Sequence, residues 1–242
     1  MKKIIYLLIA FVMAVSSKPL HAAVGDLINI QVNGSSYNGE GAVTLGRGTF
    51  WNSISGTSEA IPTLFTANYS NVLSPAVITY SADVSTAMAS GGVNGFNATP
   101  YSTLMDGYMA STTSRNITFT NLDANATYTL YVYSQKENTV PDSLTKTLIN
   151  GTALLNTVNT SNSFISGTNY IATTVYSNAS GALTFSYAPQ TINGTNVGVI
   201  NALQLHQTGG SGSAPTPEPA SLVLLGVGGL FAARKKFRKK SA

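Results

Sequence analysis

The chain of 242 residues contains no cysteine, two histidines and one tryptophan, and charged residues make up only 9% of it. Without cysteine there is no disulfide, no thiolate nucleophile and no cysteine metal ligand. One of the two histidines, His21, lies in the N-terminal segment described below, which leaves His206 for the remainder. A Ser-His-Asp triad or a zinc site with several His or Cys ligands is therefore not expected.

The few charges are unevenly distributed, which changes how the net charge of +4 is interpreted. Nine of the thirteen basic residues lie within the first 18 positions or after residue 233. The segment from residue 19 to residue 217 carries four Lys or Arg against eight Asp or Glu, so it is mildly acidic. A nucleic-acid site needs clustered cations that replace condensed counterions. Four scattered cations do not form such a cluster, and nucleic acid is not an expected partner.

The N-terminus has the pattern of a secretory signal peptide. Lys2 and Lys3 precede an apolar run from Ile4 to Val15, and the small residue Ala22 follows at the expected cleavage position. The run is short for a membrane-spanning helix, which needs about 18 or more apolar residues. Residues 1–22 are therefore predicted to direct export through the general secretion machinery and to be removed.

The C-terminus combines three features in a fixed order. The triplet Pro217-Glu218-Pro219 comes first, and an apolar run from Ala220 to Ala233 follows it. A basic cluster closes the chain: Arg234, Lys235, Lys236, Arg238, Lys239 and Lys240. Because Lys and Arg are costly to carry through lipid, this cluster predicts a stop to translocation. At about 1.5 Å per residue the run covers roughly 21 Å of a hydrocarbon core about 30 Å thick, which favours a segment that is held briefly and then processed.

This order of features resembles the PEP-CTERM sorting signal of Gram-negative bacteria, over residues 217–240. The resemblance implies recognition by exosortase, a membrane-embedded transpeptidase. It also implies removal of the tail after a transient stay in the inner membrane, and delivery to the cell surface or extracellular matrix. Many members have Ser or Thr directly after the triplet, whereas here Ala220 precedes Ser221, so the cut position stays open. An ordinary C-terminal anchor with a stop-transfer patch is the alternative.

Several stretches within residues 24–208 alternate apolar and polar side chains at the two-residue period of a half-buried strand. They are 28–32, 116–120 and 182–187. Residues 127–133 are β-branched or aromatic on both faces, which predicts a central strand covered on both sides. Residues 197–205 are expected to form the closing strand. The sequence therefore predicts an all-β domain, a β-sandwich over residues 24–208.

The segments between the strands are mostly turn material. Asn150-Gly151 is an example, since both residue types tolerate positive φ. One short helix is predicted over residues 103–109, with Ser102 as its N-cap and three side chains facing inward: Leu104, Met105 and Tyr108. Residues 209–216 are rich in Gly, Ser and Pro and are predicted to be a flexible linker to the sorting segment.

The body is also similar to PEP-CTERM ectodomains with a galactose-binding-like jelly roll. Four short motifs carry this resemblance: Gly48–Asn52, Leu104–Tyr108, residues 122–133 and Ile200–Leu205. It implies a jelly-roll-type β-sandwich ectodomain. Such sandwiches host lectin-like modules, adhesion domains and appendages of polysaccharide enzymes, and the fold alone does not choose among them.

Trp51, with Tyr37 upstream and Tyr69 downstream, is the candidate carbohydrate contact. An exposed aromatic face stacks on a sugar ring while neighbouring amides bind its hydroxyls. The competing interpretation, which we favour, is that Trp51 packs inside the sandwich like any large apolar residue. A Trp51→Ala variant is expected to separate the two, since only the first interpretation makes Trp51 a direct contact.

The acidic residues of the body are dispersed among turns, where Asp commonly completes a local hydrogen bond. A catalytic carboxylate pair is not expected, although sequence spacing cannot test it. No calcium-binding motif is present. A structural calcium ion would be the one inorganic cofactor in keeping with the fold, and Asp26 and Asp106 are the first candidates as its ligands.

These features lead to one main hypothesis and two alternatives. The main hypothesis is an exported, exosortase-sorted, non-catalytic surface or matrix protein that binds carbohydrate or associates with exopolysaccharide and biofilm. The first alternative is a glycosidase or lyase that acts on exopolysaccharide through paired carboxylates. The second is a purely structural biofilm component.

Overall fold

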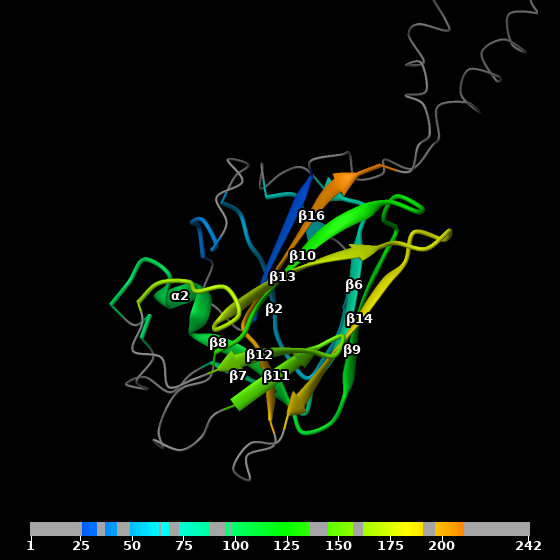
Figure 1. Cartoon of the computed structure of the whole chain (residues 1–242). Helices are drawn as coiled ribbons and strands as arrows, with labels where there is room; N and C mark the ends of the chain where they lie inside the picture. Colours follow the sequence, from blue (N-terminus) through cyan, green and yellow to red (C-terminus); the bar gives the residue numbers. More distant parts are fainter. Residues whose placement is uncertain are drawn as a thin grey trace, which may run out of the picture. The chain divides into compact units, whose positions relative to one another are not determined.

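The computed structural model (Figure 1) describes residues 26–32, 37–42, 49–62, 64–67, 73–87, 95–96, 98–135, 145–156, 162–190 and 197–210. They belong to one compact unit, residues 20–211. The predicted signal peptide, the linker beyond Gly210 and the sorting segment lie outside the described residues. None of the helical residues in the described part makes a helix of the length and hydropathy that a membrane span requires.

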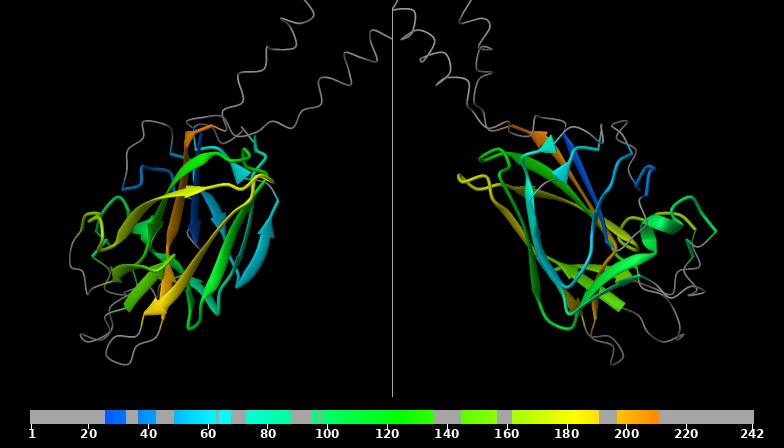
Figure 2. Two further views of the ribbon diagram at one scale, coloured as in Figure 1. Left: turned by 45° about the vertical axis from the view of Figure 1, so that its right-hand side comes forward. Right: turned by 180° about the vertical axis from the view of Figure 1, so that it is seen from behind.

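The unit is built on two large β-sheets, seen from three sides in Figures 1 and 2. The five-stranded sheet has the order β13 (Tyr170–Tyr176), β10 (Thr127–Tyr133), β16 (Ala202–Gly209), β1 (Leu27–Val32) and β2 (Asn52–Ile54). Neighbours in it are antiparallel except β1 and β2, which are parallel. Because β1 and β16 come from the two ends of the unit and pair with each other, the unit closes on itself, as an independently folding domain does.

The six-stranded sheet has the order β12 (Thr152–Asn156), β11 (Thr145–Ile149), β14 (Leu183–Gln190), β9 (Arg115–Thr120), β6 (Val77–Ser81) and β3 (Ser58–Ile61). Two small sheets complete the unit. One joins β15 (Gly198–Ile200), β8 (Gly107–Ser111) and β7 (Val84–Ala87), and the other pairs β4 (Leu64–Phe65) with β5 (Leu73–Ser74).

The main hydrophobic core combines residues of both large sheets. Alternate side chains of β10, such as Leu130 and Val132, join Ile117 and Phe119 of β9 and Phe185 of β14 in this core. All five are at most 1% exposed. Since burying such a side chain contributes about 1.5–3 kcal/mol, this layer accounts for folding without disulfides.

The all-β prediction is confirmed. The strands predicted at 28–32, 116–120, 127–133 and 182–187 correspond to β1, β9, β10 and β14. The predicted closing strand is two strands, β15 and β16, separated by Asn201. The turn residues Asn121, Asn125 and Asn150 have positive φ (59°, 53° and 46°), which matches their place between strands.

The helix predicted over residues 103–109 is wrong in its extent. The structure has a four-residue helix, α2 (Ser102–Met105), whose N-cap is Tyr101 and which has no side-chain cap. From Gly107 the chain is strand β8, paired with β7 and β15. The side chain of Asn201 donates to the carbonyl groups of Met105 (3.2 Å) and Gly107 (2.9 Å). These carbonyls are thus satisfied without further helical turns.

Candidate functional site

The outer face of the five-stranded sheet carries a row of buried amides. Ile28 and Ile30 of β1 belong to the main core, so the alternating residues Asn29 and Gln31 lie on the opposite face. Together with Gln204 of β16 they are at most 1% exposed. An outer sheet face of a sandwich usually meets water, and buried polar groups are costly unless they are hydrogen-bonded. This face must therefore be covered by other parts of the chain.

The amide row satisfies its polar groups internally and through the covering segments. Gln204 Nε2 donates to Asn29 Oδ1 at 3.0 Å. Asn29 Nδ2 in turn donates to the carbonyl oxygen of Phe50 at 3.2 Å. Gln31 Oε1 accepts from the Tyr37 backbone N–H at 3.2 Å. The row therefore fixes the segments around residues 37 and 50 to the sheet.

The segment 37–42 lies against Tyr133 of β10. The hydroxyl of Tyr133 donates to Gln204 Oε1 and accepts from the Ala42 N–H at 2.9 Å. Residue 41 has to be glycine for this approach, because a Cβ there would lie 2.5 Å from the Tyr133 hydroxyl oxygen. The indole Nε1 of Trp51 donates to the carbonyl oxygen of Gly39 at 2.9 Å and holds the other half of the segment.

A second hydrophobic cluster covers this region, and we call its eight aromatic members the aromatic cluster. They are Tyr37, Trp51, Phe96, Tyr101, Tyr131, Tyr133, Phe164 and Tyr170. The ring of Tyr133 is central, with centroids 6.2 Å from Trp51, 5.2 Å from Phe164 and 6.0 Å from Tyr170. Most of its ring pairs are edge-to-face or tilted, the arrangement that aromatic quadrupoles favour.

The aromatic cluster has a buried floor and a half-buried rim. The floor consists of Tyr37 (8% exposed), Trp51 (2%), Phe96 and Tyr133 (both 0%). The rim consists of four half-buried rings: Tyr101, Tyr131, Phe164 and Tyr170. The rim therefore presents part of its ring surface to solvent, supported from below by a packed layer.

Burial raises the pKa of three phenol groups of the cluster, those of Tyr37, Tyr131 and Tyr133. Burial raises the pKa of Tyr37 to about 12, with smaller contributions from Tyr101 and Glu40. Burial also raises the pKa of Tyr131, which Tyr170 raises further. The rim combines ring surface with hydroxyl groups, the chemistry that binds both the apolar face and the hydroxyls of a sugar.

Two of the three predicted ligand residues, Trp51 and Tyr37, lie in this cluster, but in its floor. Their rings contact each other at 5.8 Å. An exposed stacking face at Trp51 is wrong for this structure, and the interior packing that we favoured is what is observed. The physical reason is the coverage by segment 37–42. Tyr69 lies outside the described residues.

The rim residues were not singled out from the sequence. Tyr131 and Tyr133 alternate with Leu130 and Val132 in β10, so the aromatic residues of this two-sided strand indicated a second covered face. Tyr101, Phe164 and Tyr170 are far from β10 in sequence, and only the fold brings them to it.

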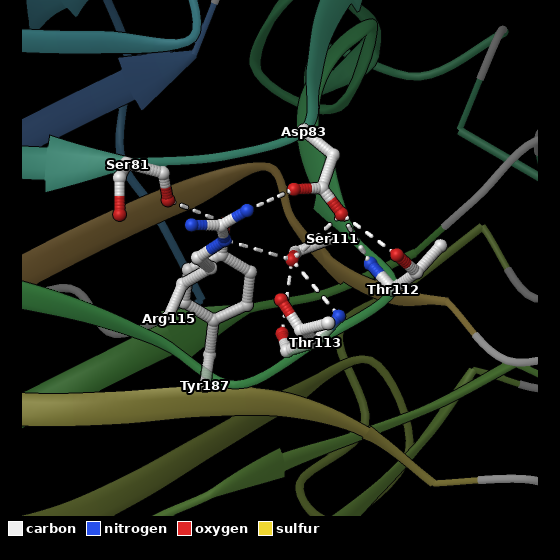
Figure 3. A network of polar contacts seen from close by, with 7 residues as sticks. All are labelled: Ser81, Asp83, Ser111, Thr112, Thr113, Arg115 and Tyr187. Carbon is white, nitrogen blue, oxygen red and sulfur yellow. Dashed lines mark hydrogen bonds and ion pairs between the residues drawn. The ribbon is translucent and has the colours of Figure 1, made fainter.

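Asp83 belongs to a separate polar network, which Figure 3 shows in close-up. Its Oδ2 accepts from the Thr112 N–H (2.7 Å) and from the Ser111 hydroxyl (3.1 Å), and its Oδ1 forms an ion pair with Arg115. The Thr112 N–H and then Arg115 lower the pKa of Asp83 well below its ordinary value. A catalytic acid needs a raised pKa. Asp83 therefore links the β6–β7 connection to the β8–β9 connection through its hydrogen bonds and its ion pair.

The other acidic candidates are placed as follows. Asp123 Oδ2 accepts from Gln207 Nε2 at 2.8 Å. Asp26 directly precedes β1, and the exposed Asp106 is the C-cap of α2. Within the described ranges, no three His, Cys, Asp or Glu side chains come together as a metal-binding group would, so Asp26 and Asp106 are not part of such a group.

Comparison with known proteins identifies the C-terminal segment. The family model described as the PEP-CTERM protein-sorting motif matches residues 215–239, which confirms the resemblance seen in the sequence. The motif implies an exported protein that is held transiently in the membrane, processed by exosortase and sorted to the cell surface. No curated protein matches the chain in sequence.

Solved structures resemble the chain at low sequence identity. The ANX2 ectodomain from Arabidopsis thaliana is 10% identical, with 75% of this chain and 42% of that chain covered and a TM-score of 0.40. The ANXUR1 extracellular domain from Arabidopsis thaliana is 13% identical, with 57% of this chain and 51% of that chain covered and a TM-score of 0.35. The chain thus spans 42% to 51% of the length of these two structures.

Proposed function

Because the chain carries a PEP-CTERM sorting motif, we propose that residues 26–210 are a non-catalytic module that binds polysaccharide outside the cell. The binding site is the rim of the aromatic cluster, and the ligand is a polymer of the exopolysaccharide or biofilm matrix. The observation that carries the proposal is the half-buried rim of Tyr101, Tyr131, Phe164 and Tyr170 over a rigid floor.

The rigidity of the floor supports a binding role. Tyr133 is fixed by hydrogen bonds to Gln204 and Ala42, and Trp51 by its bond to Gly39. Rim rings that rest on fixed neighbours lose little conformational freedom when a ligand binds, which favours affinity. Tyrosine also has few rotatable bonds for its contact area, as in other rigid binding surfaces.

The state of Asp83 supports a non-catalytic role. The carboxyl of Asp83 is held ionised by Thr112 and Arg115, whereas a glycosidase needs one carboxyl with a raised pKa. In a binding module the acidic residues serve the fold. Under this proposal no polysaccharide is cleaved.

The test is binding of the isolated unit, residues 24–210, to a glycan array, followed by titration against the best polysaccharide. Tyr101→Ala and Tyr170→Ala are expected to weaken binding about tenfold or more each, which corresponds to about 1.4 kcal/mol. Phe65→Ala is the matched control. It removes a half-buried ring outside the cluster, in edge-to-face contact with Phe50 at 5.6 Å, and is expected to bind like the wild type.

Two outcomes would contradict the proposal. One is that the rim variants bind as tightly as the wild type. The other is release of new reducing or unsaturated ends from the bound polysaccharide, which would indicate the hydrolase or lyase alternative. A unit that binds no glycan at all would favour the purely structural alternative.

A further inference from the structure

Three of the four rim rings of the aromatic cluster contact one another in a row, and their planes are inclined. The ring centroids of Tyr101 and Phe164 lie 4.7 Å apart, with an angle of 59° between the ring planes. Those of Phe164 and Tyr170 lie 6.3 Å apart, with an angle of 86°. Because these two angles differ by 27°, the planes of Tyr101 and Tyr170 are inclined by at least that amount. No two of the three rings are therefore coplanar.

The floor of the cluster fixes these orientations. The ring of Phe164 packs against Phe96 at 4.9 Å and lies edge-to-face with Tyr133 at 5.2 Å. The ring of Tyr170 stacks on Tyr133 at 6.0 Å, with 26° between the planes. Each such aromatic pair contributes about 0.5–1.5 kcal/mol beyond the area that it buries. Turning Phe164 and Tyr170 into one plane would break these contacts with the floor.

The turn that carries Phe164 and Tyr170 is fixed as well, by the side chain of Asn169. This side chain belongs to a residue that is 1% exposed. Its Oδ1 accepts from the Ile165 N–H at 2.7 Å, and its Nδ2 donates to the Ser163 carbonyl oxygen at 3.0 Å. The two hydrogen bonds hold the backbone on both sides of Phe164. Since a buried amide is costly to leave without its partners, the tilt of the rings is a fixed property of the fold.

Inclined rings and coplanar rings suit different physical forms of a polysaccharide. An aromatic ring binds a sugar by stacking on its apolar face. A crystalline polysaccharide presents its sugar faces in one plane, so several rings can stack on it only if they share a plane. A single chain in solution turns about its glycosidic bonds and can present successive sugar faces at different angles. The fixed tilt of the rim therefore matches the single chain.

We propose that the rim selects single, solvated glycan chains and rejects the flat faces of crystalline polysaccharides. This inference rests on the proposed function and narrows its ligand to one physical form. Tyr101, Phe164 and Tyr170 then stack on successive sugar units of one chain. Phe164 determines the specificity, because its ring lies between the other two and is inclined to both.

The first test compares soluble and crystalline probes with the same protein, the unit of residues 24–210. The soluble probes are the chains of the glycan array, and the crystalline probes are microcrystalline cellulose and crystalline chitin in a pull-down assay. We expect binding to chains on the array and no removal of the unit from solution by either solid. Removal by a solid that is lost in Tyr170→Ala would overturn the inference and leave the proposed function standing. A unit that binds neither the array nor a solid would overturn both.

The second test measures how binding depends on chain length. Fragments of one to six sugar units are prepared from the polysaccharide that binds most tightly on the array, and each is titrated. The Kd is expected to fall about tenfold or more between one unit and three units, because each ring engages one unit. A Kd that does not change with fragment length would overturn the inference.

Phe164→Leu tests the central ring in the same titration. The variant keeps an apolar side chain in the packing but has no ring face, so it is expected to lose most of the gain from one unit to three units, while the single unit binds as before. Phe65→Leu makes the same replacement outside the cluster and is expected to bind like the wild type. Thermal unfolding of both variants checks that the fold is intact. A Phe164→Leu unit that binds the three-unit fragment as tightly as the control would overturn the role given to Phe164.

Discussion

The hydroxyl group of Tyr133 on β10 donates a hydrogen bond to Oε1 of Gln204 on the neighbouring strand β16. Both side chains lie on the outer face of the five-stranded sheet, and both are at most 1% exposed. Gln204 continues the contact through its Nε2 to Asn29, and Tyr133 is the central ring of the aromatic cluster. This one bond therefore joins the amide row of the sheet to the aromatic layer above it.

Tyr133→Phe removes this bond and leaves Gln204 Oε1 and the Ala42 N–H without their partner. Since an unsatisfied buried polar group costs about 1–3 kcal/mol, we expect a loss of that size in the free energy of unfolding. Urea denaturation followed by the fluorescence of Trp51, 6.2 Å from the Tyr133 ring, measures it. Tyr131→Phe, on the half-buried rim, is the control and is expected to change stability by less than about 0.5 kcal/mol. A Tyr133→Phe protein as stable as the Tyr131→Phe control would show that the Tyr133–Gln204 hydrogen bond does not contribute to the stability of the fold.

Gly41→Ala tests the close approach of segment 37–42 to the sheet. The new Cβ would lie 2.5 Å from the Tyr133 hydroxyl oxygen and 2.6 Å from Gln204 Oε1, and a shift of either atom would disturb the hydrogen bonds that hold the two side chains. We expect a loss of about 1–3 kcal/mol in the free energy of unfolding. Gly209→Ala is the matched control, because its Cβ would meet Thr127 at an ordinary 3.4 Å. A Gly41→Ala protein as stable as the control would mean that segment 37–42 does not pack closely.

Asp83→Asn tests the polar network of Figure 3 through its pH dependence. The pKa of Asp83 is lowered in the folded protein, chiefly by the Thr112 N–H and Arg115. A lowered folded-state pKa contributes stability that is present above the ordinary value of 3.8 and is lost as the pH falls below it. The wild type is therefore expected to be more stable than Asp83→Asn by a constant amount above about pH 5.

Below about pH 4 the difference between the two proteins is expected to shrink. Thermal unfolding across this range measures it. Stability curves of wild type and variant that run parallel down to about pH 2 would contradict the role given to Asp83.

The basic cluster of the sorting segment can be tested by charge removal alone. Replacement of its six residues, Arg234, Lys235, Lys236, Arg238, Lys239 and Lys240, by Gln keeps the length of the chain and is expected to release uncut protein from the membrane. Replacement of Lys136 and Lys146 by Gln, two basic residues outside both the N-terminal and the C-terminal signal, is the control for a general effect of lost positive charge. Processing and localisation of the tail variant like the wild type would show that the cluster has no stop-transfer role.

Much of the fold could be predicted from the sequence, because the residues of a half-buried strand alternate between apolar and polar side chains. Strands β1, β9, β10 and β14 were found in this way, and the positive-φ turn at Asn150 from residue type. The prediction of a helix was wrong at residues 107–109, where the spacing of the apolar side chains was interpreted as helical. Strand β8 forms there because β7 and β15, both distant in sequence, pair with it.

The candidate site could be predicted only in part, because it too depends on contacts between segments that are distant in sequence. Trp51 and Tyr37 were correctly grouped, but the sequence left two interpretations of the exposure of Trp51 open, because exposure depends on segment 37–42 folding back over the sheet. The rim residues Tyr101, Phe164 and Tyr170 come from three segments whose proximity no local pattern encodes.

The sequence by itself determined the sorting motif and the two-residue pattern of the strands, since these depend on the residues along a short stretch of chain. Only the tertiary structure decided which aromatic rings are buried and which reach the surface. Those properties belong to contacts between residues far apart in the chain, and the free energy of each contact exists only once both partners are in place.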